Sequence, residues 1–457
     1  MPKKKTALTI EERLQQALVP AEEQPYKVPE NWVWVRLGAV CFFENGYAFK
    51  SDKFSSEKGI PVIRISNIKE NNVDLDDCIK TLEENIDEKF IVHQGDLLIA
   101  MSGATTGKNG VYMSANIAYL NQRVGNIKVK NKELLIEKFR NFYIANMQNE
   151  ILNTAYGGAQ PNISSQKMSV MTFPLPPLSE QQRIVERIEE LFAKLDEAKE
   201  RLQEVADSFA VRKAAILHKA FTGELTKQWR WENGVSYESW EEKKLGEVGF
   251  WLGGGTPSTS REEYWENGNI LWITSKDMKS AVIEDTLMKV NEIGVKNSSA
   301  NYIEKPALLV VMRSGILRRT FPVAMVKKPF TVNQDLKAII PDKDDLEFLY
   351  WMLLSNEQRI LDTCMKNGTT VESINSNALK DLTFKCPTLP EQHEIVRLID
   401  DLLARERSAQ QAAEQALASI DLMKKSILAR AFRGELGTNK ASEASALELL
   451  KQVLAEN

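Results

Sequence analysis

Cysteine and histidine are scarce in this sequence of 457 residues, which contains four cysteines and three histidines. None of them stands at a CxxC, HxxxH or similar spacing, so the sequence predicts neither a disulfide framework nor a metal site. Long apolar runs are missing too. None approaches the roughly 20 residues of a membrane-spanning helix, and the charged N-terminal segment lacks the apolar core of a signal peptide. We expect a cytoplasmic protein, and its length suggests about three domains.

Motifs of catalysis are also missing. We find no Asn/Asp-Pro-Pro-Tyr/Phe loop of an amino-methyltransferase, no Gly-x-Gly-x-x-Gly after a strand, and no Ser/His or Cys/His pairing that can be placed. Residues 102–108 (SGATTGK) resemble a P-loop, but the loop is one residue short and Asn109 replaces the required Ser or Thr. The sequence therefore predicts a chain that is not an enzyme and binds no cofactor of its own.

A tandem repeat organises the chain. Residues 178–185 (LSEQQRIV) return as residues 389–396 (LPEQHEIV), and residues 220–225 (AFTGEL) return as residues 431–436 (AFRGEL). Both pairs are offset by 211 residues, so nothing is inserted or deleted between them. The preceding segments repeat more loosely. Each half therefore predicts a divergent domain of about 150 residues followed by a closely matched tail.

The two tails predict long helices. Apolar residues recur on alternating steps of four and three from Ile184 to Ile216 and from Ile395 to Ile427, which is the heptad pattern of a coiled coil. Arg212 and Glu406 interrupt the two seams. The pattern fits a buried helix hairpin. It also fits two antiparallel helices that pack on each other and act as a ruler between the divergent domains.

Start and stop signals bound these helices. Residues 179–182 (SEQQ) read as a capping box, Pro390 suits a first helical turn, and Gly223 and Gly434 supply C-terminal stops. A helix over residues 180–221 would be about 60 Å long at 1.5 Å per residue.

The divergent domains carry signals for both strands and helices, so we expect each to be α+β. Short apolar runs between turn residues predict strands at residues 60–65, 96–101, 270–273 and 308–312. Helical patterns cover residues 134–152 and 346–361.

The net charge of −4 argues, taken alone, against a nucleic-acid binder. Cations are nevertheless concentrated in two windows without acidic residues, 97–132 and 305–334, at corresponding places in the two repeats. Glycine- and hydroxyl-rich loops lie nearby, at residues 102–108, 157–162 and 253–258. One such window or loop would fit a solvated face or an ordinary turn. Matched windows favour a shared surface that faces a polyanion.

Together, the repeated tails with their AFxGEL ends resemble the specificity subunit of type I restriction-modification systems. The resemblance runs from about Trp32 to Leu436, and residues 176–182 (PPLSEQQ) and 95–98 (GDLL) are among its strongest elements. The second half departs from the pattern, with Pro306-Ala307 in place of Gly-Asp and residues 313–316 (RSGI) in place of the Gly-Ala-Thr loop.

The resemblance implies that each divergent domain is a target recognition domain that reads one half of a bipartite DNA site, while the helices set the gap. It implies as partners double-stranded DNA, two modification subunits that use S-adenosylmethionine to methylate adenine N6, and restriction subunits that use ATP and Mg²⁺. Because the two domains differ in sequence, we expect an asymmetric target.

Short helices are predicted at both ends. Thr9 starts a capping box before an amphipathic segment, and residues 445–454 form another. The two could lie together near the junction of the repeats and contribute to a modification-subunit interface, or they could be solvated terminal helices.

Two other functions compete with DNA reading. A coiled-coil scaffold would have no use for the matched basic windows. A self-sufficient DNA methyltransferase would need a cofactor domain for which the chain has neither motif nor spare length.

We divide the chain into an N-terminal arm (1–30), a first recognition domain (31–178), a spacer helix (179–226), a linker (227–239), a second recognition domain (240–389), a second spacer helix (390–437) and a helical tail (438–457). Candidate DNA contacts combine cations, amides and hydroxyls of the windows, loops and strand ends. In the first repeat they are Arg64, Ser102, Thr105, Thr106, Lys108, Asn121, Gln122, Arg123, Lys128, Lys130, Gln160 and Asn162. In the second they are Thr256, Ser258, Lys276, Arg313, Ser314, Arg318, Arg319, Asn333 and Gln334.

Overall fold

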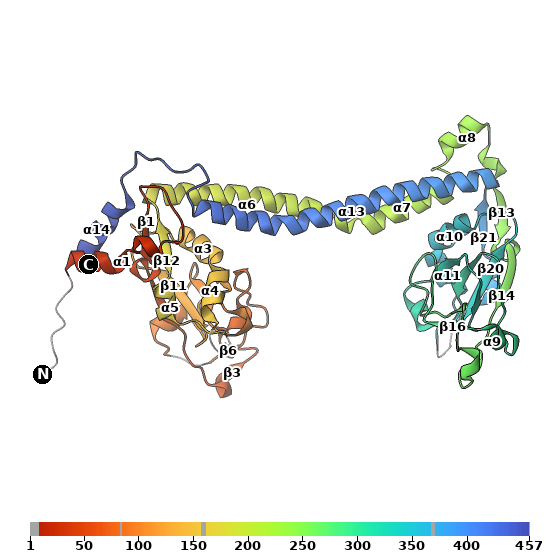
Figure 1. Cartoon of the computed structure of the whole chain (residues 1–457), viewed down its shortest axis with the longest axis horizontal. Coiled ribbons are helices and arrows are strands. Elements are labelled where there is room, and N and C mark those ends of the chain that lie inside the picture. Colours follow the sequence, from red (N-terminus) through yellow and green to blue (C-terminus); the bar gives the residue numbers. More distant parts are fainter. Residues whose placement is uncertain (1–8, 83–84, 157–160, 367–370, 457) are drawn as a thin grey trace. The chain divides into compact units, whose positions relative to one another are not determined.

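The computed structural model describes residues 9–82, 85–156, 161–366 and 371–456. The chain divides into unit 1, formed by Met1–Arg201 and Ala416–Asn457, and unit 2, formed by Leu202–Gln415 (Figure 1). Each unit combines one divergent domain with helical segments from both repeats. Within the described residues, no helix is both long and apolar enough to cross a membrane.

Unit 1 contains two five-stranded sheets and a two-stranded ribbon, together with helices, which confirms the predicted α+β class. The first sheet runs β2 (Cys41–Asn45), β11 (Val124–Val129), β8 (Leu97–Ala100), β9 (Asn109–Val111) and β5 (Asn71–Asn72). The second runs β3 (Phe54–Ser55), β6 (Lys80–Thr81), β4 (Ile60–Ile63), β10 (Ala118–Leu120) and β7 (Ile91–Val92). The ribbon pairs β1 (Val33–Arg36) with β12 (Thr172–Leu175).

Over its described residues, unit 2 repeats this plan with fewer strands. Its first sheet runs β14 (Gly249–Gly253), β20 (Leu336–Pro341), β17 (Ala307–Val311) and β18 (Val323–Val326), and its second runs β16 (Met288–Val290), β15 (Ile270–Ile273) and β19 (Phe330–Val332). The ribbon pairs β13 (Glu241–Lys244) with β21 (Thr383–Cys386). In both units the second sheet holds one parallel pair, β4 with β10 and β15 with β19. The divergent domains therefore share a topology.

The helical segments of the two domains each contain a break that the sequence did not predict. The helix predicted at residues 134–152 begins three residues later, as α3 (Glu137–Asn146), and is followed by α4 (Gln148–Ala155). The helix predicted at residues 346–361 is α10 (Leu346–Ser355), followed by α11 (Glu357–Cys364). At the second break the Asn356 side chain donates to the carbonyl of Met352 at 3.0 Å, which competes with the helical ladder. Figure 1 shows α10 and α11 along one face of the β14–β20 sheet.

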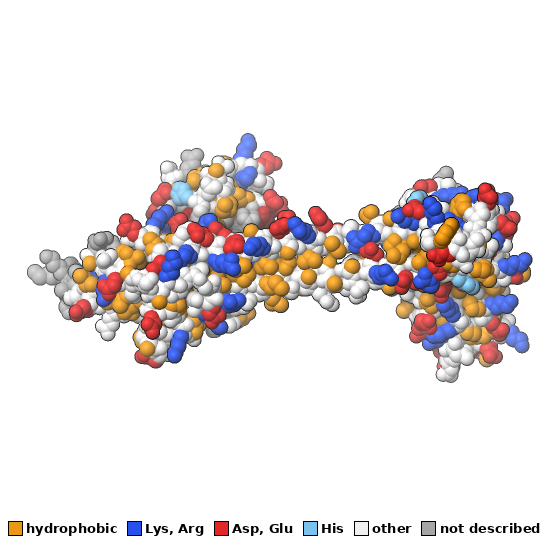
Figure 2. All heavy atoms as spheres, turned by 90° about the horizontal axis from the view of Figure 1, so that it is seen from above, with side chains coloured by type: hydrophobic (Ala, Val, Ile, Leu, Met, Phe, Trp, Pro, Cys, Tyr) orange, Lys and Arg blue, Asp and Glu red, His pale blue; other side chains and the backbone are white. Residues whose placement is uncertain are grey.

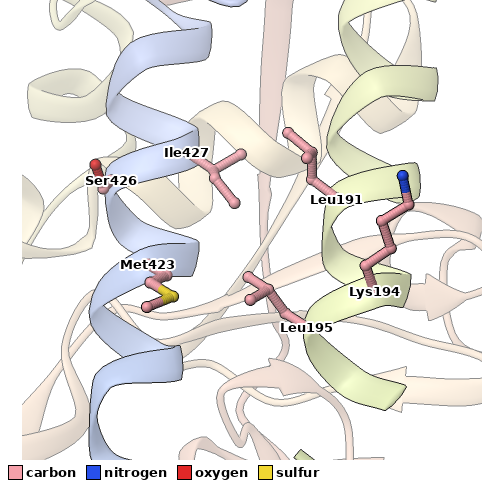
Figure 3. A pocket seen from close by; sticks show the side chains of 6 residues that line it. All are labelled: Leu191, Lys194, Leu195, Met423, Ser426 and Ile427. Atoms are coloured by element: carbon pink, nitrogen blue, oxygen red, sulfur yellow. The ribbon is translucent and has the colours of Figure 1, made fainter. Parts of the chain in front are cut away.

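In unit 1 the predicted seam forms between α6 (Leu178–Asp207) and α13 (Leu389–Ala431). Leu191 faces Ile427 and Leu195 faces Met423, so residue numbers rise on one helix as they fall on the other (Figure 3). The two helices are therefore antiparallel here, as the packed-helix interpretation predicts. Apolar side chains gather along them between charged ones (Figure 2), and Met423 remains 49% exposed.

In unit 2 the two polar interruptions of the seams meet. Arg212 of α7 (Phe209–Phe221) donates through Nε to Glu406 of α13, so the residue that interrupts one seam pairs with the residue that interrupts the other. The single helix predicted over residues 180–221 is interrupted at Ser208. Its hydroxyl donates to the carbonyl of Glu204 at 2.7 Å, and such back-bonding bends helices.

The start of each long helix carries a buried Glu-Gln pair. Glu180 is 0% exposed and accepts from the indole of Trp32 at 2.8 Å, while Glu391 is 0% exposed and accepts from the indole of Trp240 at 2.9 Å. The predicted capping box does not form. The helix already begins at Leu178, and Gln182 donates instead to Glu186 at 2.9 Å.

The neighbouring glutamines fasten the domains to the helices. Gln181 accepts from the amide of Ile136 at 2.9 Å, and Gln392 accepts from the amide of Asp345 at 2.8 Å. The repeated motif at the helix start thus holds each divergent domain through a buried indole and one backbone amide.

Each AFxGEL end packs in the unit that holds the divergent domain of the other repeat. Phe432 lies in unit 1 against Phe139 and Tyr143, with ring centroids 5.3 and 4.9 Å apart, and Phe221 lies in unit 2 against Phe348 at 5.5 Å. Phe432 is fully buried, and burial of a side chain of this size contributes about 1.5–3 kcal/mol, whereas Phe221 is only partly buried. The predicted stops are confirmed, because Gly223 and Gly434 adopt positive φ angles of 78° and 74°.

The two terminal helices lie side by side in unit 1 (Figure 1). The predicted capping box of Thr9 starts α1 (Ile10–Ala17), and α14 (Ala446–Glu456) packs on it, with Arg13 donating to the carbonyl of Leu454 at 3.3 Å. The tail before α14 is tied to α6, since Arg183 donates through both Nη atoms to Glu443 at 2.9 and 2.8 Å. The two terminal helices therefore lie together, as one of the two alternatives has it, but they belong to unit 1, whereas the junction of the repeats at residues 227–239 belongs to unit 2.

Candidate nucleic-acid interface

Strand ends bring several candidate residues of unit 1 together. The strands β4, β8 and β10 end, and β11 begins, at one edge of the two sheets. The amide of Asn121 donates to the carbonyl of Ile63 at 3.1 Å, and the amide of Met101 donates to that of Arg123 at 3.0 Å. Ser102 forms a β-bridge with Asn162. We call this group loop cluster 1: Arg64, residues 102–108, residues 121–123 and Asn162.

Three polar atoms of loop cluster 1 have no hydrogen-bond partner within the described part of the chain. They are Arg64 Nε, Ser102 Oγ and Thr105 Oγ1, all buried from solvent. Buried polar groups in folded proteins are nearly always paired, so these atoms are open to a ligand, Arg64 Nε as a donor and the two hydroxyls as donors or acceptors. Thr106 differs, since its buried hydroxyl donates to the carbonyl of Gly103 at 2.7 Å and serves the turn itself.

Other members of loop cluster 1 face solvent. Gln122, Arg123 and Asn162 are exposed, and Asn121 and Lys108 are partly buried. The predicted contact Gln160 lies outside the described residues. The side-chain amide of Gln122 and the cations Arg123 and Lys108 can contact both phosphates and base edges. They lie in the same cluster as the unpaired hydroxyls of Ser102 and Thr105.

The structure does not bring Lys128 and Lys130 into this cluster. They lie at the opposite end of β11 from Arg123, about 20 Å along the strand at 3.3 Å per residue. Lys128 forms an ion pair with Glu44 at 2.7 Å, and Lys130 donates to the carbonyl of Gly38. Both cations therefore have partners within their own domain.

Unit 2 gathers the matching loops in the same way. The amide of Asn333 donates to the carbonyl of Ile273 at 3.0 Å, and the amide of Met312 donates to that of Asp335 at 2.7 Å. Arg313 forms a β-bridge with Ser373. We call this group loop cluster 2: residues 274–277, 313–319, 333–335 and 372–373.

The remaining candidates of the second repeat, apart from Ser258, sit in or beside loop cluster 2. Thr256 donates to the side chain of Gln334 at 2.8 Å, and Lys276 is exposed in the turn after β15. Ser314 caps the following short helix through its side chain, whereas the hydroxyl of Ser258 lies 2.8 Å from that of Ser260. Asn333 is buried and Arg319 is exposed.

Loop cluster 2 contains three carboxylates that the sequence analysis missed. Asp277 accepts from the amide and the hydroxyl of Thr274 at 2.9 and 2.8 Å, and the other two pair with arginines. Arg313 donates through Nε to Asp335 at 2.8 Å, and Arg318 donates through Nε to Glu372, whose pKa this hydrogen bond lowers. The acid-free window stops at Gln334, one residue before Asp335, and Glu372 is far away in the sequence. Aligning Asn121-Gln122 of the first repeat with Asn333-Gln334 of the second would have shown that Asp335 is the residue equivalent to Arg123.

Other cations of the second window are also paired within unit 2. Lys327 contacts Glu347 and Lys328 contacts Glu284, both at 2.7 Å. The windows therefore do not form continuous basic faces, and the shared feature is the pair of loop clusters. Among the described residues, no group of three or more His, Cys, Asp or Glu side chains could hold a metal ion.

Comparison with known proteins gives a consistent result. Residues 29–207 and 237–416 each match the family model described as the type I restriction modification DNA specificity domain. The EcoBI specificity subunit of Escherichia coli is 27% identical over 463 aligned positions, which cover 94% of this chain and 93% of that protein. The EcoR124I/EcoR124II specificity subunit of the same species is 40% identical over 161 residues, or 35% of this chain and 40% of that protein.

A solved structure shares the fold. The HsdS subunit from Thermoanaerobacter tengcongensis has a TM-score of 0.63 at 19% identity, covering 91% of this chain and all of that one. The similarity extends over both divergent domains and the helical segments that carry them.

Proposed function

The chain belongs to the family of type I restriction-modification DNA specificity domains, and from this membership we propose how its two units divide the work of reading DNA. It is a specificity subunit, the non-catalytic component that recognises DNA sequence within a type I restriction-modification complex. Loop clusters 1 and 2 each read one half of a bipartite target.

The observation that carries this proposal is the match between the two clusters. The same hydrogen bonds organise both, yet the side chains they present differ, with Arg123 in the place of Asp335 and Arg64 in the place of Thr274. Base edges in the major groove differ in their donors and acceptors. Two readers with different side chains therefore select different sequences, which supports an asymmetric target.

The antiparallel helices are proposed to set the gap between the two half-sites. Heptad contacts in unit 1 and the Arg212–Glu406 pair in unit 2 support a fixed register, and a fixed register gives a constant separation of the readers.

Assembly with the other subunits of a type I system follows from family membership. We propose the finer arrangement that the sequence suggests. Two modification subunits carry S-adenosylmethionine and methylate adenine N6, restriction subunits use ATP and Mg²⁺, and this chain holds none of these cofactors. The complex would act on DNA in the cytoplasm.

Co-purification from the native host tests the proposal, followed by mapping of methylated adenines in DNA modified by the complex. We expect one bipartite motif with unlike halves, and no S-adenosylmethionine binding or methyl transfer by the homogeneous chain alone. Methyl transfer by the isolated chain would favour the self-sufficient methyltransferase. A complex without sequence preference would favour a scaffold.

Exchange of one domain tests the division of labour. Replacing residues 31–177 with the corresponding domain of a relative should change one half-site and leave the other. Simultaneous change of both halves would contradict independent readers.

A further inference from the structure

Two arginines of loop cluster 2 are each held by a carboxylate in the same manner. Arg313 donates through Nε to Asp335 at 2.8 Å, and Arg318 donates through Nε to Glu372. The arginine side chains are 58% and 69% exposed, while those of the two acids are only 22% and 17% exposed. The cations therefore project outward from acids that are sheltered beneath them.

Both acids are fixed to the backbone of the loop that carries the arginines. The carbonyl of Asp335 accepts from the amides of Met312 and Arg313 at 2.7 and 3.2 Å, and the carbonyl of Glu372 accepts from the amide of Ser314 at 3.0 Å. Asn333 donates from its amide to the second oxygen of Asp335 at 3.3 Å. Backbone hydrogen bonds thus fix the positions of Asp335 and Glu372 relative to the loop that carries the two arginines.

The use of Nε leaves the far edge of each guanidinium available. Within the described residues, the Nη atoms of Arg313 and Arg318 donate no hydrogen bond. These two nitrogens form the fork that pairs with O6 and N7 of guanine. A carboxylate on Nε orients that fork and lowers the entropy lost when it binds.

An acid in a DNA-facing loop also carries a cost, because it repels phosphates and weakens binding to every sequence. Exposed ion pairs contribute little to folding stability, so stability gives a weak reason to keep two of them here. Orientation of a base-reading arginine gives a stronger reason.

We propose that Asp335 and Glu372 are positioning residues for sequence recognition, which hold Arg313 and Arg318 as forks that read guanines in the half-site of unit 2. The proposal rests on the proposed function and adds the chemistry of one reader. Loop cluster 1 uses a different chemistry, because Arg123 stands where Asp335 would be and is not paired with a carboxylate among the described residues.

The test uses the chain assembled with its own modification subunits, on duplexes that carry the mapped target and on random duplexes of equal length. Asp335→Asn should lower affinity for the target by between about 5-fold and about 150-fold, the range that one bidentate arginine–guanine pair supplies. Affinity for random DNA should rise, because a repelling charge is removed. Glu372→Gln should behave alike. Asp381→Asn is the matched control, since it removes the same charge from an exposed pair with Lys244 in the same unit.

A double-mutant cycle separates positioning from a structural role. Arg313→Lys keeps the charge and loses the fork, so Asp335→Asn should cost little further target affinity in that background. Replacing guanines of the affected half-site with 7-deazaguanine removes N7, and it should weaken the parent complex more than the Asp335→Asn complex.

Equal losses on target and random DNA, or additive effects in the cycle, would overturn the proposal. So would a half-site without guanine at the positions that Asp335→Asn affects. If the parent complex discriminates sequences but both acid variants match the Asp381→Asn control, only this inference fails. If the parent itself does not discriminate, the proposed function fails.

Discussion

Removal of the Arg230 side chain should unfold unit 2 at a much lower temperature. Arg230, in α8 (Lys227–Asn233), donates through Nη1 to the buried Glu391 at 2.7 Å and through Nη2 to the carbonyl of Gly223 at 2.6 Å. Arg230→Met keeps most of the apolar stem but leaves the carboxylate of Glu391, which is 0% exposed, without its counter-ion. Breaking a buried ion pair in this way costs about 3–5 kcal/mol.

The size of the effect follows from the size of the unit. For domains of 150–250 residues, 1 kcal/mol shifts the melting temperature by about 2–4 °C, so the loss should be on the order of 10 °C. Thermal unfolding measures the loss, and hydrogen exchange should locate it in unit 2, since the pair joins segments of that unit.

Two further variants make this result interpretable. Arg405→Met breaks an exposed pair with Asp401 in the same unit and should change stability by less than about 0.5 kcal/mol. Arg230→Met combined with Glu391→Gln removes the uncompensated charge while the amide oxygen still accepts from Trp240, so most of the lost stability should return. The reasoning is refuted if Arg230→Met melts like Arg405→Met, or if the double variant is no more stable than the single one.

Three other predictions concern unit 1, the helices and DNA. Burial raises the pKa of the Glu180 carboxyl, so ionisation of this group opposes folding. The parent should therefore lose stability relative to Glu180→Gln as pH rises from about 4.5 towards 7. Denaturant titrations measure this difference in stability, and a difference that does not change with pH would contradict the prediction. Inserting one heptad into both α6 and α13 at facing positions lengthens each helix by about 10 Å. Mapping of methylated adenines should then show both half-sites, separated by a gap that is wider by roughly three base pairs. An active variant with the original gap would contradict the proposal that the helices set the gap. Arg123→Ala should weaken binding to all DNA and lower the slope of log affinity against log salt concentration by about one. Lys128→Ala should change neither quantity, because Glu44 already neutralises the charge of Lys128. Salt titrations of binding compare the two variants, and equal effects would place the interface elsewhere.

The sequence was sufficient for features that depend on periodicity and repetition. The heptads predicted packed helices, and the polar residues that interrupt them, Arg212 and Glu406, pair with each other. The strands at residues 60–65 and 270–273 correspond to β4 and β15 with ends shifted by at most two residues. Such features follow from local spacing of apolar side chains, which the sequence displays directly.

Features that depend on tertiary contacts were not predictable from spacing. Lys128 lies in an acid-free window, yet strand pairing of β11 with β2 brings Glu44 beside it. Glu372 reaches Arg318 from a segment more than fifty residues away. Glu180 and Glu391 read as helix-start residues, but indoles from distant segments bury them. A charge in a linear window therefore says little about its partner in space.

The equal spacing of the two tails has a structural reason. Each unit takes its buried glutamate from one repeat and part of its hydrogen-bonding from the other: Thr438 and Asn439 donate to Glu180, and Thr226 donates to Glu391. Residues 180–221 therefore run from unit 1 into unit 2, and residues 391–432 run over the same number of residues from unit 2 into unit 1. An insertion in one helix alone would pull an AFxGEL end out of its aromatic contacts, whereas insertions matched in both would not. This constraint accounts for the constant offset of 211 residues between the two tails, which have equal lengths although the divergent domains differ in sequence.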